Sequence, residues 1–436
     1  MKKVLITTLG CKVNQYESAA FRTGLEEAGM KVVSRGAGAD IVVINTCAVT
    51  GSAGAQSRQA LRRALRNNPQ ARIIVTGCYA ELAAKELAAE QDLQGRNYSL
   101  IGNSKKDRLV EHLLQEEGAN EELLGTVAAA SEICRLPVRR FGDRSRAYLR
   151  IQDGCESFCT YCIVPFTRGP SRSLPPDEVI AQAETYAEGG YREIILTGIH
   201  IGNYGRDLVG RPALTSLLDR LSLTTPEVAY RISSLEPLEI DEALLALMAA
   251  RGNIQPHLHI PLQSGHNEIL ARMNRRYTTE EFYQKVDLCR KRLPDAAIGI
   301  DILVGFPGET AVQFAESLAF LQSLDFTYLH VFPYSMRPGT VAAGFADQVP
   351  QKVKEERVAV LRRLSDEKRT TFYQSQLGRT WPVIVEGRRD EEGLLQGFTA
   401  NYVAVRFAGP DDLLHGLANV RLQKLHDNHI FGESIP

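Results

Sequence analysis

Short apolar runs alternate with amphipathic stretches along the N-terminal quarter of the chain. Runs at residues 4–8, 41–45, 73–76 and 100–102 predict buried strands, and residues 18–28 and 56–66 between them predict helices. Short buried strands that alternate with helices are typical of a doubly wound parallel sheet. We therefore expect an α/β domain over residues 1–116.

The same alternation returns in the middle of the chain. Strands are predicted to begin near Tyr148, Glu193, Val228, His257, Ile298 and Tyr328. Successive starts are about one βα unit apart, which favours a partial (βα)6 barrel with its chemistry at the carboxyl ends of the strands. We place this barrel at residues 141–371. Residues 117–140, which are first acidic, then Ala-rich and then basic, are expected to form a linker.

A charged helical stretch at residues 352–376 leads into a third pattern. Strand-like runs at residues 382–386, 394–399, 402–407 and 417–425 are separated by glycines and charged turns. Several short strands at close spacing predict a small all-β barrel over residues 372–436.

Composition and charge narrow the class of protein. The chain has 436 residues, 44% of them apolar, and a formal net charge of -1, so any RNA-binding face must be local. Met1 to Cys11 has the outline of a lipoprotein leader, but its apolar run holds two threonines and is too short, and it fits a buried strand better. We expect a cytoplasmic protein with no membrane association, in which clustered cysteines favour metal over disulfides.

Three cysteines form a CxxxCxxC loop directly after the first strand of the predicted barrel: Cys155, Cys159 and Cys162. Three thiolates on one short loop suit three irons of a cubic iron–sulfur cluster and leave the fourth iron open to another ligand. The alternatives are a zinc site completed by a distant histidine and three unrelated loop thiols.

Three other cysteines each lie just past the end of a predicted parallel strand: Cys11, Cys47 and Cys78. Because the carboxyl ends of parallel strands line one edge of a sheet, these thiols are predicted to converge on a second cluster. The alternative is three separately buried thiols. Cys134, in the predicted linker, and Cys289, in a predicted helix, fit neither set and are not expected to be ligands.

Two cysteine triplets in this order, followed by a small β-barrel, resemble the methylthiotransferase family of radical S-adenosylmethionine enzymes over essentially the whole chain. Four stretches are similar to the branch that acts on N6-threonylcarbamoyladenosine beside the anticodon: GCKVNQYES at residues 10–18, NTCAVT at 45–50, TGIHIG at 197–202 and HLHIPLQSG at 257–265. The resemblance implies an auxiliary 4Fe-4S cluster on the first triplet, a radical 4Fe-4S cluster with S-adenosylmethionine on the second, and an RNA-binding, OB-like TRAM domain at the C-terminus.

The reaction implied by the resemblance uses S-adenosylmethionine twice. One molecule methylates a sulfur held at the auxiliary cluster, and a second is cleaved to the radical that starts replacement of the adenine C2 hydrogen by methylthio. The implied partners are the tRNA anticodon loop and an electron donor such as flavodoxin or ferredoxin; the sulfur donor stays open. The alternatives are the same chemistry on isopentenyladenosine or on a ribosomal-protein aspartate, and a non-catalytic, metal-containing RNA-binding protein.

Candidate contacts for the cofactor and the RNA complete the prediction. Residues at strand ends and near the cysteine loop are expected to hold S-adenosylmethionine: Tyr161, Thr197, Gly198, Ser233, Glu236, Gly305, Phe332 and Tyr334. Basic residues near the site are expected to meet RNA phosphates: Arg58, Arg62, Arg168 and Arg172. A solvated helix face is the alternative for Arg58 and Arg62. His257 and His259 share one strand face, which we interpret as a hydrogen-bonded core pair rather than as ligands; the alternative is a pair of polar groups that point into the barrel.

Overall fold

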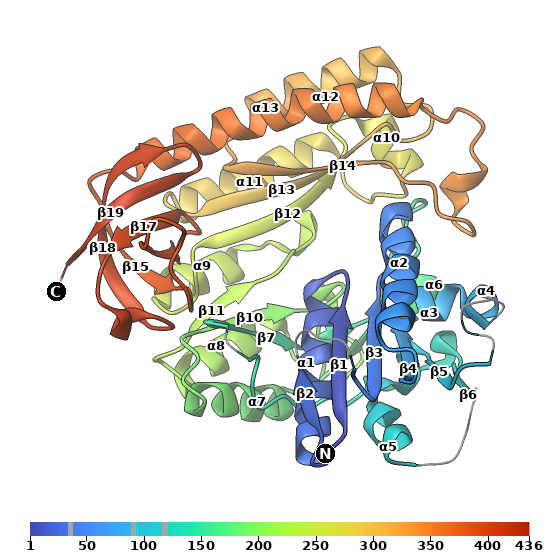
Figure 1. Ribbon diagram of the computed structural model, residues 1–436. Coiled ribbons are helices and arrows are strands. Elements are labelled where there is room, and N and C mark those ends of the chain that lie inside the picture. The colour runs from blue at the N-terminus through green and yellow to red at the C-terminus, as the bar shows by residue number, and fades with distance from the viewer. Residues whose placement is uncertain (34–37, 89–92, 94, 116–120, 143, 436) are drawn as a thin grey trace.

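A parallel sheet, an open barrel and a small closed barrel follow one another along the chain (Figure 1). This computed structural model describes residues 1–33, 38–88, 93, 95–115, 121–142 and 144–435. The mixed α/β class and the order of the three units agree with the prediction from the sequence. Within the described ranges, no helix is both long enough and apolar enough to cross a membrane.

The N-terminal sheet has six parallel strands in the order β2-β1-β3-β4-β5-β6. They are β1 (Lys3–Thr8), β2 (Lys31–Val33), β3 (Ile41–Thr46), β4 (Arg72–Gly77), β5 (Tyr98–Ile101) and β6 (Glu121–Leu123). The four central strands were predicted. The edge strands β2 and β6 were not, because three residues are too few to set up a periodic pattern. β6 lies within the segment assigned to the linker.

Helices cover both faces of this sheet. On one face, α1 (Lys12–Glu27) and α5 (Leu109–Leu114) share a core with the central barrel, and Phe21 and Leu25 lie in it. On the other face, α2 (Gly51–Asn67) packs Leu61 and Leu65 into a separate core. Two short helices, α3 (Cys78–Leu82) and α4 (Ala84–Ala88), and a 3-10 turn at Asn103–Arg108 complete the domain. The shared core makes α1 part of the interface between the first two units.

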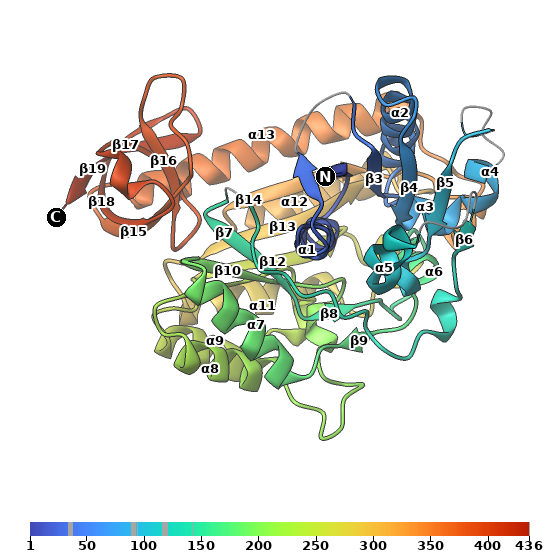
Figure 2. The ribbon, with the colours of Figure 1, turned by 60° about the horizontal axis from the view of Figure 1, so that its bottom comes forward.

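Six parallel strands form the open barrel as two sheets, β11-β10-β7 and β12-β13-β14, bridged between Tyr230 and Ile254. The strands are β7 (Arg146–Arg150), β10 (Glu193–Thr197), β11 (Ala229–Ile232), β12 (His257–Gln263), β13 (Ala297–Val304) and β14 (Tyr328–Pro333). The outer helices are α7 (Pro176–Glu188), α8 (Leu214–Thr224), α9 (Glu242–Ala250), α10 (Asn267–Arg272), α11 (Thr279–Arg292) and α12 (Ala311–Ser323). Figure 2 shows α7 and α8 on the side of the barrel that faces away from α13.

The long helix α13 (Gln351–Ser375) leads to a closed barrel in the order β15-β16-β17-β19-β18. Its strands are β15 (Thr380–Val385), β16 (Leu395–Thr399), β17 (Ala404–Ala408), β18 (Leu417–His426) and β19 (His429–Ile435), of which β19 was not predicted. Alternate residues such as Val383, Val405 and Phe407 fill its core. α13 runs without a break across residue 371, where the sequence analysis placed the domain boundary.

The C-terminal barrel is docked on the open barrel through residues 398–402. Arg231 Nη1 donates to the Ala400 carbonyl at 3.1 Å, and Asn401 Nδ2 donates to the Asp295 carbonyl at 3.0 Å. The Tyr402 ring lies 4.7 Å from the His257 ring, centroid to centroid. The two barrels therefore share buried contacts as well as a connecting helix.

Candidate active site between two cysteine loops

Three cysteines meet at the carboxyl edge of the N-terminal sheet. Cys11 is the N-cap residue of α1, Cys47 follows β3, and Cys78 opens α3 directly after β4. A Cβ on Gly10 would lie 2.8 Å from the Cys47 Sγ, and the charges of the three thiols act on one another. Burial raises the pKa of Cys11 and raises the pKa of Cys47 to about 11, so both thiols keep their protons until a metal displaces them.

The CxxxCxxC loop lies at the carboxyl end of the first barrel strand, after the two-residue strand β8 (Gln152–Asp153). The Cys155 amide donates to the Gly169 carbonyl at 3.0 Å, and the Thr160 amide donates to the Met273 carbonyl at 3.0 Å. Cys155, Cys159 and Cys162 are all half-buried. The loop is thus held from both sides while its thiols stay accessible.

Two basic side chains touch these thiols. His200 Nδ1 lies 3.6 Å from the Cys155 Sγ, and Arg275 Nη1 lies 3.4 Å from the Cys159 Sγ. Burial would raise the pKa of Cys155, but hydrogen bonds with His200 and Ser157 lower it. Burial instead raises the pKa of Cys162 to about 12, so the loop combines one activated thiol with one that is protonated until a metal binds.

Each triplet offers three thiols, the donor set that an iron–sulfur cluster takes when one iron is left open. In the ranges that the structure describes, the side chains whose ligand atoms all lie within 4.8 Å of one another are His259, Asp301 and His330, a mixed set of imidazoles and a carboxylate. The thiol chemistry of the cysteine loops fits iron–sulfur clusters.

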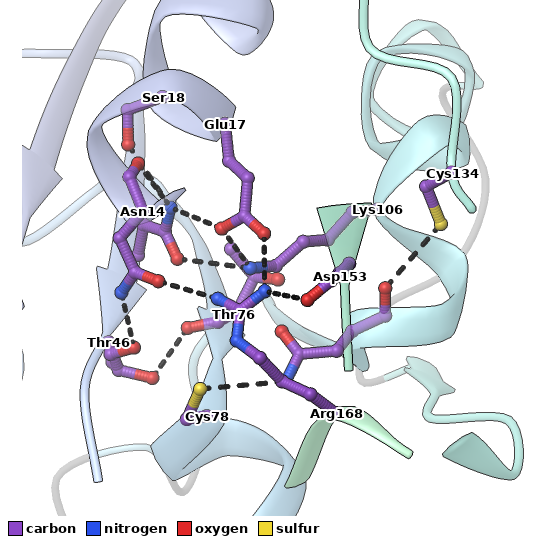
Figure 3. A network of polar contacts seen from close by, with 12 residues as sticks. Asn14, Glu17, Ser18, Thr46, Thr76, Cys78, Lys106, Cys134, Asp153 and Arg168 are labelled. Atoms are coloured by element: carbon purple, nitrogen blue, oxygen red, sulfur yellow. Dashed lines mark hydrogen bonds and ion pairs between the residues drawn. The ribbon is translucent and has the colours of Figure 1, made fainter. Parts of the chain in front are cut away.

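Arg168, at the end of α6 (Val164–Arg168), lies in a buried polar network between α1 and β8 (Figure 3). Its Nη1 donates to Glu17 Oε1 at 3.1 Å and to Asp153 Oδ1 at 2.9 Å, and its Nη2 donates to Asn14 Oδ1 at 2.8 Å. Asn14 in turn donates to the Thr46 carbonyl at 2.9 Å. One guanidinium thus joins the start of α1 to β8 just before the CxxxCxxC loop, and Asn14 extends the network to the end of β3.

The carboxylates of this network are ionised although they are buried. Burial would raise the pKa of Glu17, but the charges of Arg168, Lys106 and Arg150 lower it to about 2. The pKa of Asp153 is lowered in the same way, chiefly by Arg168. Lys106 forms an ion pair with Glu17. Buried charges that are paired in this way hold the two domains in one relative position.

The prediction that Arg168 and Arg172 meet RNA is wrong in this structure. Arg168 is 1% exposed and Arg172 is 4% exposed, so neither guanidinium reaches the surface. The sequence alone could not distinguish an arginine in a buried ion pair from one that contacts phosphate at the surface, because the acidic partners come from distant segments. Arg58 and Arg62 lie on α2, where Arg62 is exposed and Arg58 donates to the Tyr79 hydroxyl at 2.7 Å.

Four of the predicted cofactor contacts lie beside the CxxxCxxC loop or at the ends of barrel strands, where their side chains are placed to contact a cofactor. Ser233 Oγ, just after β11, is buried without a hydrogen-bond partner. Glu236 forms an ion pair with Arg275. Tyr161 packs beside a small apolar core, and Phe332, at the end of β14, is 46% exposed.

Protein atoms surround the other four predicted cofactor contacts. A Cβ on Gly198 would lie 2.7 Å from Ile201, and one on Gly305 would lie 2.4 Å from Lys354. The Thr197 carbonyl accepts from the Ile151 amide, and Tyr334 packs edge-on against Phe306. Close packing accounts for Gly198, whereas Gly305 has both a close neighbour and a φ of +71°.

A cavity of about 530 Å³ opens beside the CxxxCxxC loop. Its lining includes Cys159, His200, Glu236, Arg275 and Tyr277. His200 Nε2 lies 2.6 Å from Glu239 Oε1, which fixes the imidazole against the cavity wall. Of these residues, only Glu236 was predicted from the sequence as a cofactor contact. His200 lies inside the TGIHIG stretch that carried the resemblance, whereas nothing in the sequence pointed to Arg275.

The two cysteines outside the triplets and one of the paired histidines have ordinary surroundings. Cys289 is fully buried in α11, and Cys134 donates to the Asn103 carbonyl at 3.5 Å. His257 is buried and hydrogen-bonded to the Tyr328 hydroxyl at 2.8 Å, which confirms its interpretation as a core histidine.

Comparison with known proteins agrees with this geometry. The Radical SAM superfamily model matches residues 149–321, and a model described as uncharacterized protein family UPF0004 matches residues 3–95. The radical S-adenosylmethionine methyltransferase TsrM from Kitasatospora setae, solved with cobalamin and a 4Fe-4S cluster bound, has a TM-score of 0.56 at 16% identity, over 78% of this chain and 74% of that chain. Fold and cysteine loop together define a radical S-adenosylmethionine enzyme, a class that uses an iron–sulfur cluster and S-adenosylmethionine.

Two curated relatives narrow the class to a family. Threonylcarbamoyladenosine tRNA methylthiotransferase MtaB of Bacillus subtilis is 39% identical over 97% of this chain and 94% of that protein. The tRNA-2-methylthio-N(6)-dimethylallyladenosine synthase of Geobacillus kaustophilus is 32% identical over 100% of this chain and 82% of that protein. The chain belongs to the tRNA methylthiotransferase family.

Proposed function

We propose that this enzyme converts N6-threonylcarbamoyladenosine in tRNA into its 2-methylthio derivative. The observation that carries the proposal is the near-full-length similarity to the Bacillus subtilis enzyme, at 39% identity, combined with two cysteine loops joined through Arg168. A passive RNA-binding protein would not need two such loops clamped against each other.

The two triplets would each hold a 4Fe-4S cluster. Cys11, Cys47 and Cys78 would hold the auxiliary cluster, and Cys155, Cys159 and Cys162 the radical cluster. When bound, the clusters supply the sulfur to be methylated and the electron that cleaves S-adenosylmethionine. The chain's own task is placement: Arg168, Glu17 and Asp153 keep the two loops in register, so that one nucleotide can lie between them.

The second cofactor would bind between the radical loop and the strand ends. Ser233 Oγ is free for a hydrogen bond, and Glu236 and Arg275 line the adjoining cavity as a charged pair. Tyr161 and Phe332 offer ring surface, and the backbone at Thr197, Gly198, Gly305 and Tyr334 would shape the pocket.

The substrate would be an unpaired nucleotide of the tRNA anticodon loop, because only an unstacked base can enter a site between two domains. Arg58 and Arg62 on α2 and the C-terminal barrel are the proposed contacts for RNA. The enzyme would work in the cytoplasm and take electrons from a donor such as flavodoxin or ferredoxin.

Anaerobic assay of the purified enzyme tests the proposal. The substrate is tRNA from a strain that lacks this gene, supplied with S-adenosylmethionine and a reductant, and the readout is nucleoside mass spectrometry. We expect 2-methylthio-N6-threonylcarbamoyladenosine. Conversion of isopentenyladenosine instead would keep the chemistry and refute the substrate. Cleavage of S-adenosylmethionine with no change in tRNA would point to the ribosomal-protein aspartate.

Two sets of cysteine variants separate the clusters. Replacement of Cys11, Cys47 and Cys78 by alanine should reduce iron from about eight to about four atoms per chain and abolish methylthiolation, while slow cleavage of S-adenosylmethionine continues. Replacement of Cys155, Cys159 and Cys162 should abolish that cleavage. Full methylthiolation by the first variant would refute the auxiliary site.

A further inference from the structure

Three neighbouring strands of the open barrel carry polar side chains on one face. His259 on β12, Asp301 on β13 and His330 on β14 alternate with residues such as Ile300, which lies in the core shared with the outer helices. Successive side chains of a strand point to opposite faces, so these three point into the barrel. Asp301 and His330 are direct partners in the sheet, and His259 lies on the next strand. Two imidazoles and a carboxylate therefore meet on one surface.

Their ligand atoms have the spacing of atoms that bind one metal ion. His259 Nε2 lies 3.0 Å from Asp301 Oδ1, and His330 Nδ1 lies 3.4 Å from the same oxygen. One ligand atom from each residue lies within 4.8 Å of the other two. Histidine nitrogens and carboxylate oxygens bind zinc at about 2.0–2.2 Å, which puts neighbouring ligands of a tetrahedral site roughly 3.3 Å apart. Two of the three pairs already have that spacing.

A hydrogen-bonded ion pair does not account for this arrangement. His259 Nε2 and Asp301 Oδ1 are buried, and neither has a hydrogen-bond partner among the residues that the structure describes, although only 3.0 Å separates them. A hydrogen bond at that distance requires the N–H to point at the oxygen, so the two atoms are directed elsewhere. Buried polar atoms without partners cost free energy, and a cation bound by both atoms would remove that cost.

The second nitrogen of His259 is held in the manner of a metal ligand. Its Nδ1 lies 2.8 Å from the Oγ of Ser234, just after β11. In the tautomer in which Nδ1 donates to this hydroxyl, Nε2 keeps a lone pair for a metal. Histidines that bind metals are commonly oriented by such a hydrogen bond on the other ring nitrogen. Ser234 is therefore a positioning residue for the imidazole.

Tyr328 forms a wall beside the two imidazoles. Its ring centroid lies 5.1 Å from that of His330 and 6.4 Å from that of His259. Gly299 is the sheet partner of both His259 and Tyr328, and a Cβ at Gly299 would collide with the tyrosine ring. The side chain of His330 is 51% exposed, so the group is open to solvent on that side.

We propose that His259, Asp301 and His330 bind a zinc ion, with its fourth position open to water or another oxygen ligand on the side of His330. Two imidazoles and a carboxylate form the protein ligand set of many zinc sites, and such sites prefer zinc to ferrous iron. The site shares no residue with either cysteine triplet and does not depend on the proposed substrate. For His259, metal binding replaces the core-pair interpretation drawn from the sequence, which holds for His257.

Zinc binding to the holoenzyme tests the proposal. The anaerobic enzyme, with its clusters assembled, is dialysed against buffered Zn²⁺ in excess Mg²⁺, and mass spectrometry measures zinc and iron. Wild type should retain about one zinc per chain, because Mg²⁺ competes poorly for imidazole. Asp301→Asn, which keeps the side-chain size, and His330→Gln, at an exposed position, should each weaken zinc binding at least about ten-fold without loss of iron. Ser234→Ala should weaken it by about ten-fold.

X-ray absorption at the zinc edge identifies the ligands separately from the clusters, because iron absorbs at a different energy. We expect nitrogen and oxygen ligands at about 2.0–2.2 Å. Sulfur ligands at about 2.3 Å would assign the zinc to cysteines and overturn the proposal.

His266→Gln is the matched control. His266 lies 2.9 Å from Glu316 in an ion pair, and within the described ranges no third ligand atom completes that pair. This variant should bind zinc as wild type does. Absence of zinc from wild type, or equal zinc content in Asp301→Asn and wild type, would also overturn the proposal. Failure to modify tRNA by a protein that binds zinc in this way would refute only the proposed function.

Discussion

Glu17 and Asp153 lie buried in different domains and share the guanidinium of Arg168. A buried ion pair adds little net stability compared with apolar residues, but loss of one member leaves the others as uncompensated buried charge. The network fixes relative position, because it ties α1, which follows Cys11, to β8, which precedes the CxxxCxxC loop.

Arg168→Met should lower the free energy of unfolding by about 3–5 kcal/mol, because two carboxylates lose a shared buried partner. Denaturant unfolding measures the change. Arg139→Met is the control: Arg139 is exposed and pairs with Glu27 at the surface, so its loss should cost about 0–1 kcal/mol. Equal effects of the two substitutions would contradict a clamping role for Arg168.

The lowered pKa of Glu17 predicts a pH dependence of stability. Its pKa falls from 4.5 to about 2 on folding, so its contribution is present above the unfolded-state value and is lost as the pH falls toward 2. The free energy of unfolding of the cluster-free protein should therefore decrease between about pH 5 and pH 3. Glu17→Gln should weaken the pH dependence of the free energy of unfolding by an amount that corresponds to about one bound proton. Denaturant unfolding at a series of pH values measures this dependence. An unchanged slope would contradict ionised burial of Glu17.

At the scale of elements, the turn from β1 into α1 sets how closely Cys11 and Cys47 approach. Gly10 has a φ of +94°, and a Cβ there would lie 2.7 Å from the Cys47 Cβ. Neither the backbone conformation nor the space allows another residue. The N-terminal strands place the cysteines at one edge, and this turn then brings two of them together.

Gly10→Ala should displace Cys47 and prevent assembly of the auxiliary cluster. Iron content should fall to about half, with the radical loop and its cleavage of S-adenosylmethionine retained. Gly29→Ala is the matched control, because Gly29 has a φ of +77° but nothing within 4 Å of the added Cβ. It should cost about 1 kcal/mol in stability and no iron. Full iron content in Gly10→Ala would show that this turn does not govern the site.

At the scale of the whole molecule, the C-terminal barrel packs against the open barrel through Tyr402. Tyr402 lies 4.7 Å from the His257 ring and 4.8 Å from the Arg231 guanidinium, and it stacks on Phe398 at 4.9 Å. The C-terminal barrel is therefore joined to the open barrel by ring and cation–π contacts as well as by α13.

Tyr402→Ala should lower the free energy of unfolding by about 1–3 kcal/mol through loss of ring contacts. It should also speed proteolysis between α13 and β15, which limited digestion followed by mass spectrometry measures. Tyr283→Ala, at a 44% exposed position on α11, should change neither. If the two variants digest alike, the barrels are joined only by their connecting helix.

The periodic patterns and cysteine positions in the sequence were enough for the order of the three units, the four central strands of the first sheet and the class of chemistry. Hydrophobic period and strand-end position are local properties, so they can be read along the chain. The short edge strands β2 and β6 were not predicted, since their pairing depends on neighbouring strands rather than on their own residues.

Only the tertiary structure decided what the charged residues do. Arg168 and Arg172, which a sequence reading places on RNA, are buried, because Glu17, Asn14 and Asp153 meet them only after the domains pack. Arg275 reaches the Cys159 thiol from more than a hundred residues away, with no local signal. The role of a charged residue depends on its neighbours, and distant segments become neighbours only when the chain folds.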